Sequence, residues 1–257
     1  MEPTFPIWVF FILIPVLGVF AVEFGYRLAQ LRNFPEGDEP SVSGLVQVLF
    51  ALFALMLAFS FNMAQSHFQI RKNLVLQEVN NIGTVYLRAG LLDEPTKNQA
   101  RNYLVDYTAS RLESLNDPDR IEQSIINSEN IVNQLWQLAV QIGKEDDKSI
   151  TNGLFMQSLN DLIDTGAERA KARLHSHITL PIWAILFALL FLSMATMGYH
   201  TGVSGTRLYS VYIFVILAFS LVMYLVADLD QPQRGIINVS QMEMVDLHSK
   251  LSTSVQN

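Results

Sequence analysis

Residues 44–63 have the sequence GLVQVLFALFALMLAFSFNM, which contains no charged side chain. A helix of about 20 residues, rising about 1.5 Å per residue, crosses the roughly 30 Å hydrocarbon core of a bilayer. Three further uncharged apolar stretches of similar length lie at Phe5–Val22, Ile178–Met197 and Leu208–Val226. Buried helices of soluble proteins seldom reach this length without a charge. We therefore predict an integral membrane protein with four transmembrane helices in a lipid bilayer.

The composition excludes several functional classes. The chain has 257 residues and a formal net charge of −7, which argues against nucleic acid as a partner because phosphates attract clustered Lys and Arg. It has no cysteine, so disulfides and thiolate metal ligands are excluded. We find no glycine-rich phosphate loop and no nucleophile motif in a strand–turn–helix context. We predict a protein that is not an enzyme and has neither a metal site nor a cofactor.

The polar segment between the second and third apolar stretches predicts a helical bundle. Apolar residues recur there at helical spacing, and Pro95 and Pro118 suit the first turns of helices. No useful run alternates as a strand does, so the expected fold is all-α. The expected divisions are membrane helices in residues 1–64, a cytoplasmic helical domain in 65–177, membrane helices in 178–227 and a cytoplasmic tail in 228–257. Within the tail, Met244, Leu247 and Leu251 would share one face of a short helix.

Basic residues near the helix ends predict the orientation, because cytoplasmic loops are enriched in Lys and Arg. One side of the membrane would carry six of them: Arg71, Lys72, Arg169, Lys171, Arg173 and Arg234. The other side would carry three: Arg27, Arg32 and Arg207. We therefore expect both termini and the helical domain in the cytoplasm.

The second apolar stretch carries two adjacent stripes. One is small and polar and consists of Gln47, Ala51, Ala54, Ala58, Asn62 and Gln65; the other is bulky and consists of Phe50, Phe53, Leu57 and Phe61. Small residues allow membrane helices to approach closely. Alternatively, the polar residues face water and the phenylalanines form an apolar constriction. The candidate pore-lining residues are Gln47, Phe50, Phe53, Ala54, Leu57 and Asn62.

Two carboxylates lie at the end of the fourth apolar stretch, where the helix dipole is already negative. Asp228 and Asp230 therefore need an opposite charge. Basic side chains expected at the same depth would supply it, and a divalent cation is the alternative. The polar side of the extended second helix could join this group. The predicted interface network consists of Arg71, Glu78, Arg88, Asp228, Asp230 and Arg234.

Two stretches of the chain resemble the bestrophin-like bacterial membrane proteins. The first is Glu78-Val-Asn-Asn-Ile-Gly-Thr-Val-Tyr-Leu-Arg88, and the second is Asp228-Leu-Asp-Gln-Pro-Gln-Arg-Gly235. The resemblance implies a bacterial inner-membrane protein that is distantly related to pentameric anion channels, in which the second helix lines the pore. In one departure from the pattern, Gln231 stands where the family often has Arg.

Two functions follow as expectations. The first is a homo-oligomeric channel that passes small anions through a neck of Phe50, Phe53 and Leu57. The second is a non-conducting membrane scaffold or sensor whose helical domain binds a cytoplasmic partner.

Overall fold

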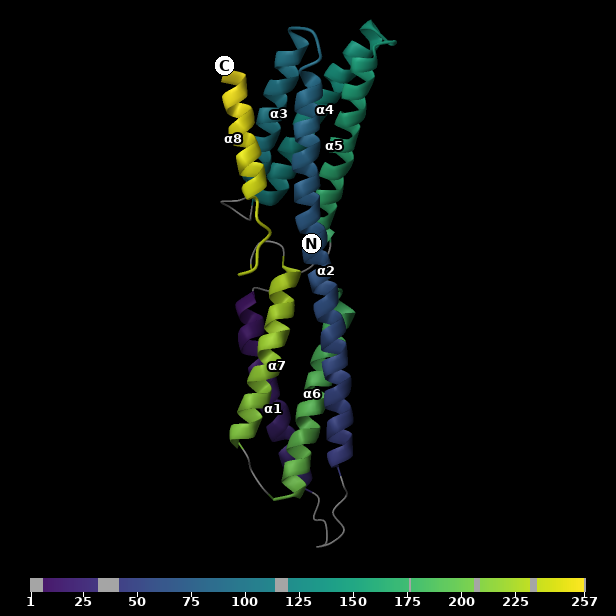
Figure 1. The fold of residues 1–257 in the computed structure, drawn as a ribbon. Coiled ribbons are helices and arrows are strands. Elements are labelled where there is room, and N and C mark those ends of the chain that lie inside the picture. Colours follow the sequence, from purple (N-terminus) through teal and green to yellow (C-terminus); the bar gives the residue numbers. More distant parts are fainter. Residues whose placement is uncertain are drawn as a thin grey trace. The chain divides into compact units, whose positions relative to one another are not determined.

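The computed structural model describes residues 7–31, 42–113, 120–175, 177–205, 209–231 and 235–256. All regular elements in these residues are helices (Figure 1). Their bounds are α1 Ile7–Gln30, α2 Ser43–Ala89, α3 Thr96–Glu113, α4 Ile121–Glu145, α5 Ile150–His175, α6 Leu180–Val203, α7 Tyr209–Asp230 and α8 Met242–Gln256. The chain forms two compact units: a membrane unit of Met1–Phe68 and His177–Asn238, and a bundle unit of Gln69–Ser176 and Val239–Asn257.

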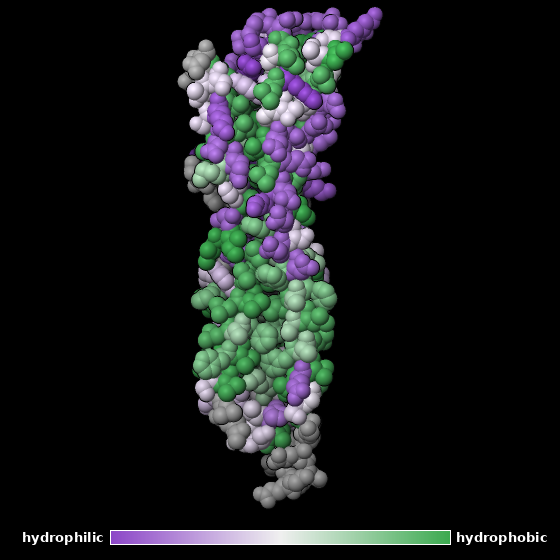
Figure 2. Space-filling view, in the orientation of Figure 1, coloured by the Kyte–Doolittle hydropathy of each residue, from purple (hydrophilic) through white to green (hydrophobic). Residues whose placement is uncertain are grey.

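The membrane unit contains α1, the first part of α2, α6 and α7. Each of these helices is long and apolar enough to cross a membrane. Large hydrophobic side chains stay on the surface of the unit, including Phe11, Phe20 and Phe214 with 61%, 60% and 73% exposure. Figure 2 shows such residues covering the visible face of this unit. A surface of this kind suits lipid and not water, and the protein is a membrane protein with the predicted four apolar helices.

Glycines bring α1 and α6 into direct backbone contact. A Cβ atom on Gly25 would lie 1.8 Å from the carbonyl oxygen of Ala195. A Cβ atom on Gly198 would lie 2.0 Å from the carbonyl oxygen of Val22. Gly198 and Gly202 are four residues apart, so they share one face of α6 and form the small-x-x-x-small pattern that packs membrane helices closely.

The bundle unit surrounds a core of its own. The second part of α2 packs there with α3, α4, α5 and α8, and Leu104, Leu135 and Leu159 are fully buried. Helix α8 packs on α3 through Met244 and Leu251, with 0% and 4% exposure. The apolar face of α8 therefore completes the core of the bundle unit.

Candidate functional site

The polar face of the extended α2 binds α5. Glu78, Asn81 and Arg88 lie at helical spacing, and their partners on α5 follow the opposite order along the chain. These partners are Arg169, Thr165 and the carbonyl oxygen of Leu154, respectively. Asn81 donates to the hydroxyl of Thr165 at 2.8 Å, and Arg88 donates to the Leu154 carbonyl at 2.7 Å. The first stretch of the family resemblance is therefore the polar seam between two antiparallel helices.

The seam contains a carboxylate that is completely buried. Oε1 of Glu78 accepts hydrogen bonds from Oη of Tyr107 at 2.5 Å and from Nε of Arg111 at 2.9 Å, and its other oxygen binds Arg169. The exposed fraction of Glu78 is 0%. Burial and the negative charge of Glu78 raise the pKa of Tyr107, so its hydroxyl stays protonated and donates. Two guanidinium groups face one carboxylate, which leaves this cluster with a net charge of one positive unit.

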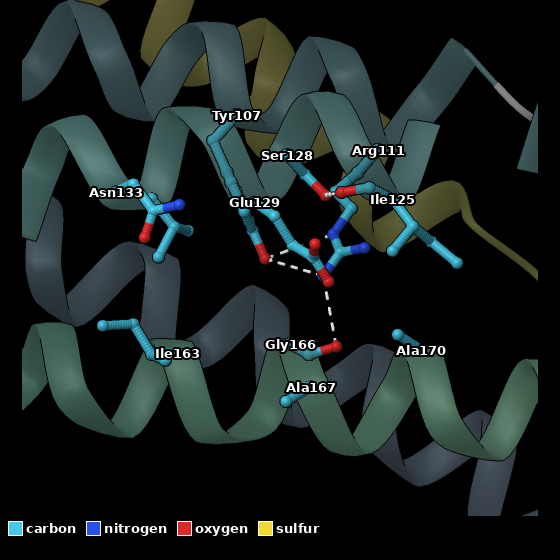
Figure 3. Close-up of a pocket in the computed structure, with 11 residues that line it drawn as sticks. Tyr107, Arg111, Ile125, Ser128, Glu129, Asn133, Ile163, Gly166, Ala167 and Ala170 are labelled. Carbon is cyan, nitrogen blue, oxygen red and sulfur yellow. Dashed lines mark hydrogen bonds between the residues drawn. The ribbon is translucent and has the colours of Figure 1, made fainter. Parts of the chain in front are cut away.

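A cavity of about 280 Å³ lies beside the cluster, between α3, α4 and α5 (Figure 3). Tyr107 and Arg111 line it from α3, Glu129 from α4, and Gly166 from α5. The Nη2 atom of Arg111 donates to the carbonyl oxygen of Gly166 at 3.3 Å, which fixes the guanidinium at the cavity wall. A fixed cation beside an open cavity can bind an anionic group.

The two carboxylates at the end of α7 accept hydrogen bonds from backbone amides. Asp228 accepts from the amides of Ile236 and Ile237 at 2.8 and 2.9 Å. Asp230 accepts from the amide of Ile178 at 2.9 Å. The exposed fractions of Asp228 and Asp230 are 2% and 6%. The dipole of α7 disfavours negative charge at its C-terminal end. The hydrogen-bonding backbone amides therefore stabilise the negative charges of Asp228 and Asp230 there.

The second stretch of the family resemblance ends at Gly235, whose backbone lies against the carboxylate of Asp228. A Cβ atom at this position would lie 2.6 Å from Oδ1 of Asp228. Any larger residue would push the following amides away from the carboxylate. Glycine at position 235 therefore lets the amides of Ile236 and Ile237 reach the carboxylate of Asp228.

The predicted interface network contains residues of both units: Arg71, Glu78 and Arg88 belong to the bundle unit, and Asp228 and Asp230 belong to the membrane unit. Glu78 and Arg88 bind groups within the bundle unit, because the polar face of α2 is the face that α5 covers. Asp228 accepts hydrogen bonds from backbone amides, and its pairing with a guanidinium group stays a prediction. Arg71 is buried, with 5% exposure. Arg234 lies outside the described residues.

The predicted pore-lining residues on α2 separate into two sets. Phe53 and Leu57 have 0% and 3% exposure and belong to the core of the membrane unit. The ring of Phe53 lies 4.8 Å from that of Phe219 on α7, and partly buried Phe50 packs on the same ring at 5.6 Å. The small and polar stripe is instead exposed along its whole length, at Gln47, Ala51, Ala54, Ala58, Asn62 and Gln65. Phe50 and Phe53 thus face α7, and Leu57 lies in the same core.

Two groups of important residues were missed by sequence reasoning. Tyr107 and Arg111 share the inner face of α3 with Leu104, and a charged residue on an otherwise apolar helical face was the available signal. Gly198 and Gly202 form a small-x-x-x-small pair inside an apolar helix, and this pattern was visible in the sequence.

The chain is similar to one protein family and to several solved structures. The Bestrophin-like domain model matches residues 9–244. A crystal structure of a bacterial bestrophin homolog from Klebsiella pneumoniae, solved by zinc phasing, is 17% identical with a TM-score of 0.67 and covers 98% of this chain and 99% of its own. A tryptophan-to-alanine variant of that homolog is 16% identical with a TM-score of 0.69, and the match covers 98% and 97% of the two chains. No curated protein matches the sequence.

The solved structures share the fold of this chain, and the family model spans nearly all of it. Both quoted stretches lie inside the matched residues 9–244. The chain belongs to the bestrophin-like family.

Proposed function

We propose that this protein is a homo-oligomeric channel for small anions whose pore is lined by α2. The observation that carries this proposal is the exposed small and polar stripe of α2, which begins at Gln47 and ends at Gln65. No other apolar helix of the membrane unit exposes amide side chains along such a stripe in the described residues. Amide groups in the hydrocarbon would be costly, whereas they are well solvated in a water-filled pore.

The charges along α2 favour anions over cations. Between Ser43 and Gln77 the helix carries no Asp or Glu, and its first formal charges are Arg71 and Lys72. Cation channels usually carry rings of carboxylates, whereas anion pores carry Lys or Arg. Repetition of α2 around an oligomer axis would place the exposed Lys72 in a ring at one end of the pore. Family membership supports a pentamer, in which five copies of the stripe enclose the pathway.

The neck of the pore needs bulky side chains that remain on the surface of the single chain. Leu55 and Phe59 meet this requirement, with 53% and 60% exposure. They are four residues apart and therefore lie on one side of α2, next to the small and polar stripe. We assign the apolar neck to Leu55 and Phe59, while Phe50, Phe53 and Leu57 pack the pore helix against the rest of the membrane unit. A dewetted neck of this kind would favour weakly hydrated anions.

Anion flux from liposomes that contain the purified protein tests this function. Wild type should release chloride and, faster, iodide. Replacing Phe59 with Ala should raise the flux and reduce the preference for iodide, because the neck becomes wider and wetter. Phe53→Ala is the matched control: it removes the same side chain from the core of the membrane unit, so it should lower stability without raising flux. Correctly assembled wild-type protein without any flux would contradict the channel and favour the scaffold or sensor.

The orientation and location of the protein are part of the same proposal. The bias of basic residues and the family support a bacterial inner-membrane protein with the bundle unit and both termini in the cytoplasm. The exposed basic residue Lys72 would then stand at the cytoplasmic end of the pathway.

A further inference from the structure

The cavity beside Arg111 is lined by residues of the bundle unit, and its charges point to a ligand. Arg111 is buried, with 6% exposure, and Glu78, Tyr107 and Gly166 hold it through Nε and Nη2. The third nitrogen, Nη1, makes no hydrogen bond to any residue that the structure describes. Figure 3 shows the Arg111 side chain extending into the cavity. A fixed guanidinium that still has free donors is suited to a carboxylate.

Arg111 and Arg169 share a single carboxylate as their counter-charge. Glu78 is the one carboxylate within ion-pair distance of Arg111 and Arg169 in the described part of the chain. Arg173 lies close enough to sense both groups, because burial and the charges of Arg169 and Arg111 lower its pKa to about 9. That guanidinium remains protonated at neutral pH and adds to the positive potential. An anionic group in the cavity would relieve this excess charge.

The wall of the cavity also carries a negative charge. Glu129 is exposed on α4 and lines the same cavity. Figure 3 shows its side chain extending toward the space that Arg111 also faces. No ion pair joins Glu129 to Arg111 or to another described residue. Two opposite charges thus share one cavity without pairing with each other.

We propose that this cavity binds a small zwitterion with an amino-acid head group, whose carboxylate contacts Arg111 and whose ammonium contacts Glu129. The volume of about 280 Å³ is small for a ligand pocket, so the ligand has few heavy atoms. Ile125, Val132 and Ile163 supply apolar lining for a short aliphatic side chain. A ligand with a carboxylate alone would be repelled by Glu129, and one with an amine alone would be repelled by Arg111.

Calorimetric titration of the full-length protein in detergent with three probes tests this site. The probes are L-alanine, propionate, which lacks the ammonium group, and ethylamine, which lacks the carboxylate. Alanine should bind in the millimolar range or tighter, and the other two should bind at least tenfold more weakly because each loses one charge-assisted contact. Equal binding of propionate would overturn the zwitterion site in favour of a simple anion site. Absence of alanine binding would overturn the site altogether.

Two variants locate the binding without disturbing the buried ion cluster. Glu129→Gln keeps the shape of an exposed side chain and should weaken alanine binding at least tenfold. Ala167→Phe should fill the cavity and abolish binding while every charge remains. The matched control is Glu122→Gln, an exposed carboxylate of α4 that does not line the cavity, and its affinity should equal that of wild type. Wild-type affinity in Glu129→Gln would contradict the proposal. These measurements need no membrane, so their failure would leave the channel proposal standing.

Discussion

Nε of Arg111 donates to Oε1 of Glu78 at 2.9 Å, and the side chains have 7% and 0% exposure. The pair joins α3 to the extended α2, and Arg169 joins α5 to the same carboxylate. Separating charges from water is costly, so a buried carboxylate persists only if its partners satisfy it completely. The side chain of Glu78 therefore connects three helices of the bundle unit, α2, α3 and α5, through buried ion pairs.

Glu78→Gln should strongly destabilise the bundle unit. The change leaves Arg111 and Arg169 buried without a counter-charge, at a cost of about 3–5 kcal/mol. Thermal unfolding of the purified protein in detergent would measure the loss as a lower melting temperature. Glu168→Gln, an exposed carboxylate on α5, is the control and should leave the melting temperature unchanged. Equal melting temperatures for the two variants would show that the cluster does not stabilise the fold.

Asp228→Ala should destabilise the membrane unit. The amides of Ile236 and Ile237 would lose a charged acceptor, which costs about 2–3 kcal/mol for a partly buried site. The same melting experiment applies, and Asp146→Ala, at an exposed position after α4, should have little effect. If added divalent cations raised the stability of wild type but not of Asp228→Ala, a metal site would replace the amide contacts as the role of this carboxylate.

Gly198→Ala should weaken the packing of α1 on α6. The added Cβ would meet the carbonyl oxygen of Val22 at 2.0 Å, so the helices must separate, at about 1–3 kcal/mol. Gly153→Ala on α5 meets nothing within 4 Å and should instead stabilise its helix by about 0.5–1 kcal/mol. The two substitutions should therefore shift the melting temperature in opposite directions. A rise for Gly198→Ala would contradict the close backbone contact.

A reporter fused after Asn257 should show cytoplasmic activity. The bias of basic residues toward one side of the membrane motivates this expectation. A fluorescent protein and a periplasmic phosphatase, each fused at the same position, give opposite signals and control for expression. Phosphatase activity from this fusion would reverse the orientation and place the bundle unit outside the cytoplasm.

The sequence alone predicted the elements whose signal is local. An uncharged stretch such as residues 44–63 specifies a membrane helix by its length and composition, without reference to any partner. The apolar face of α8 likewise follows from the spacing of Met244 and Leu251, and the structure buries both. These properties depend on neighbours along one helix, which the sequence contains.

Only the tertiary structure decided which partners the polar and bulky residues take. The spacing of Phe53 shows that it shares a face with Leu57, but not that α7 covers this face. The partner of Glu78 on α5 lies 91 residues further along the chain, so no local pattern could select Arg169 over Arg71. Asp228 accepts hydrogen bonds from backbone amides. Every residue except proline has such an amide, so the sequence does not indicate which amides would be the partners. Helix identity is set by local periodicity, whereas side-chain pairing is set by which helices meet.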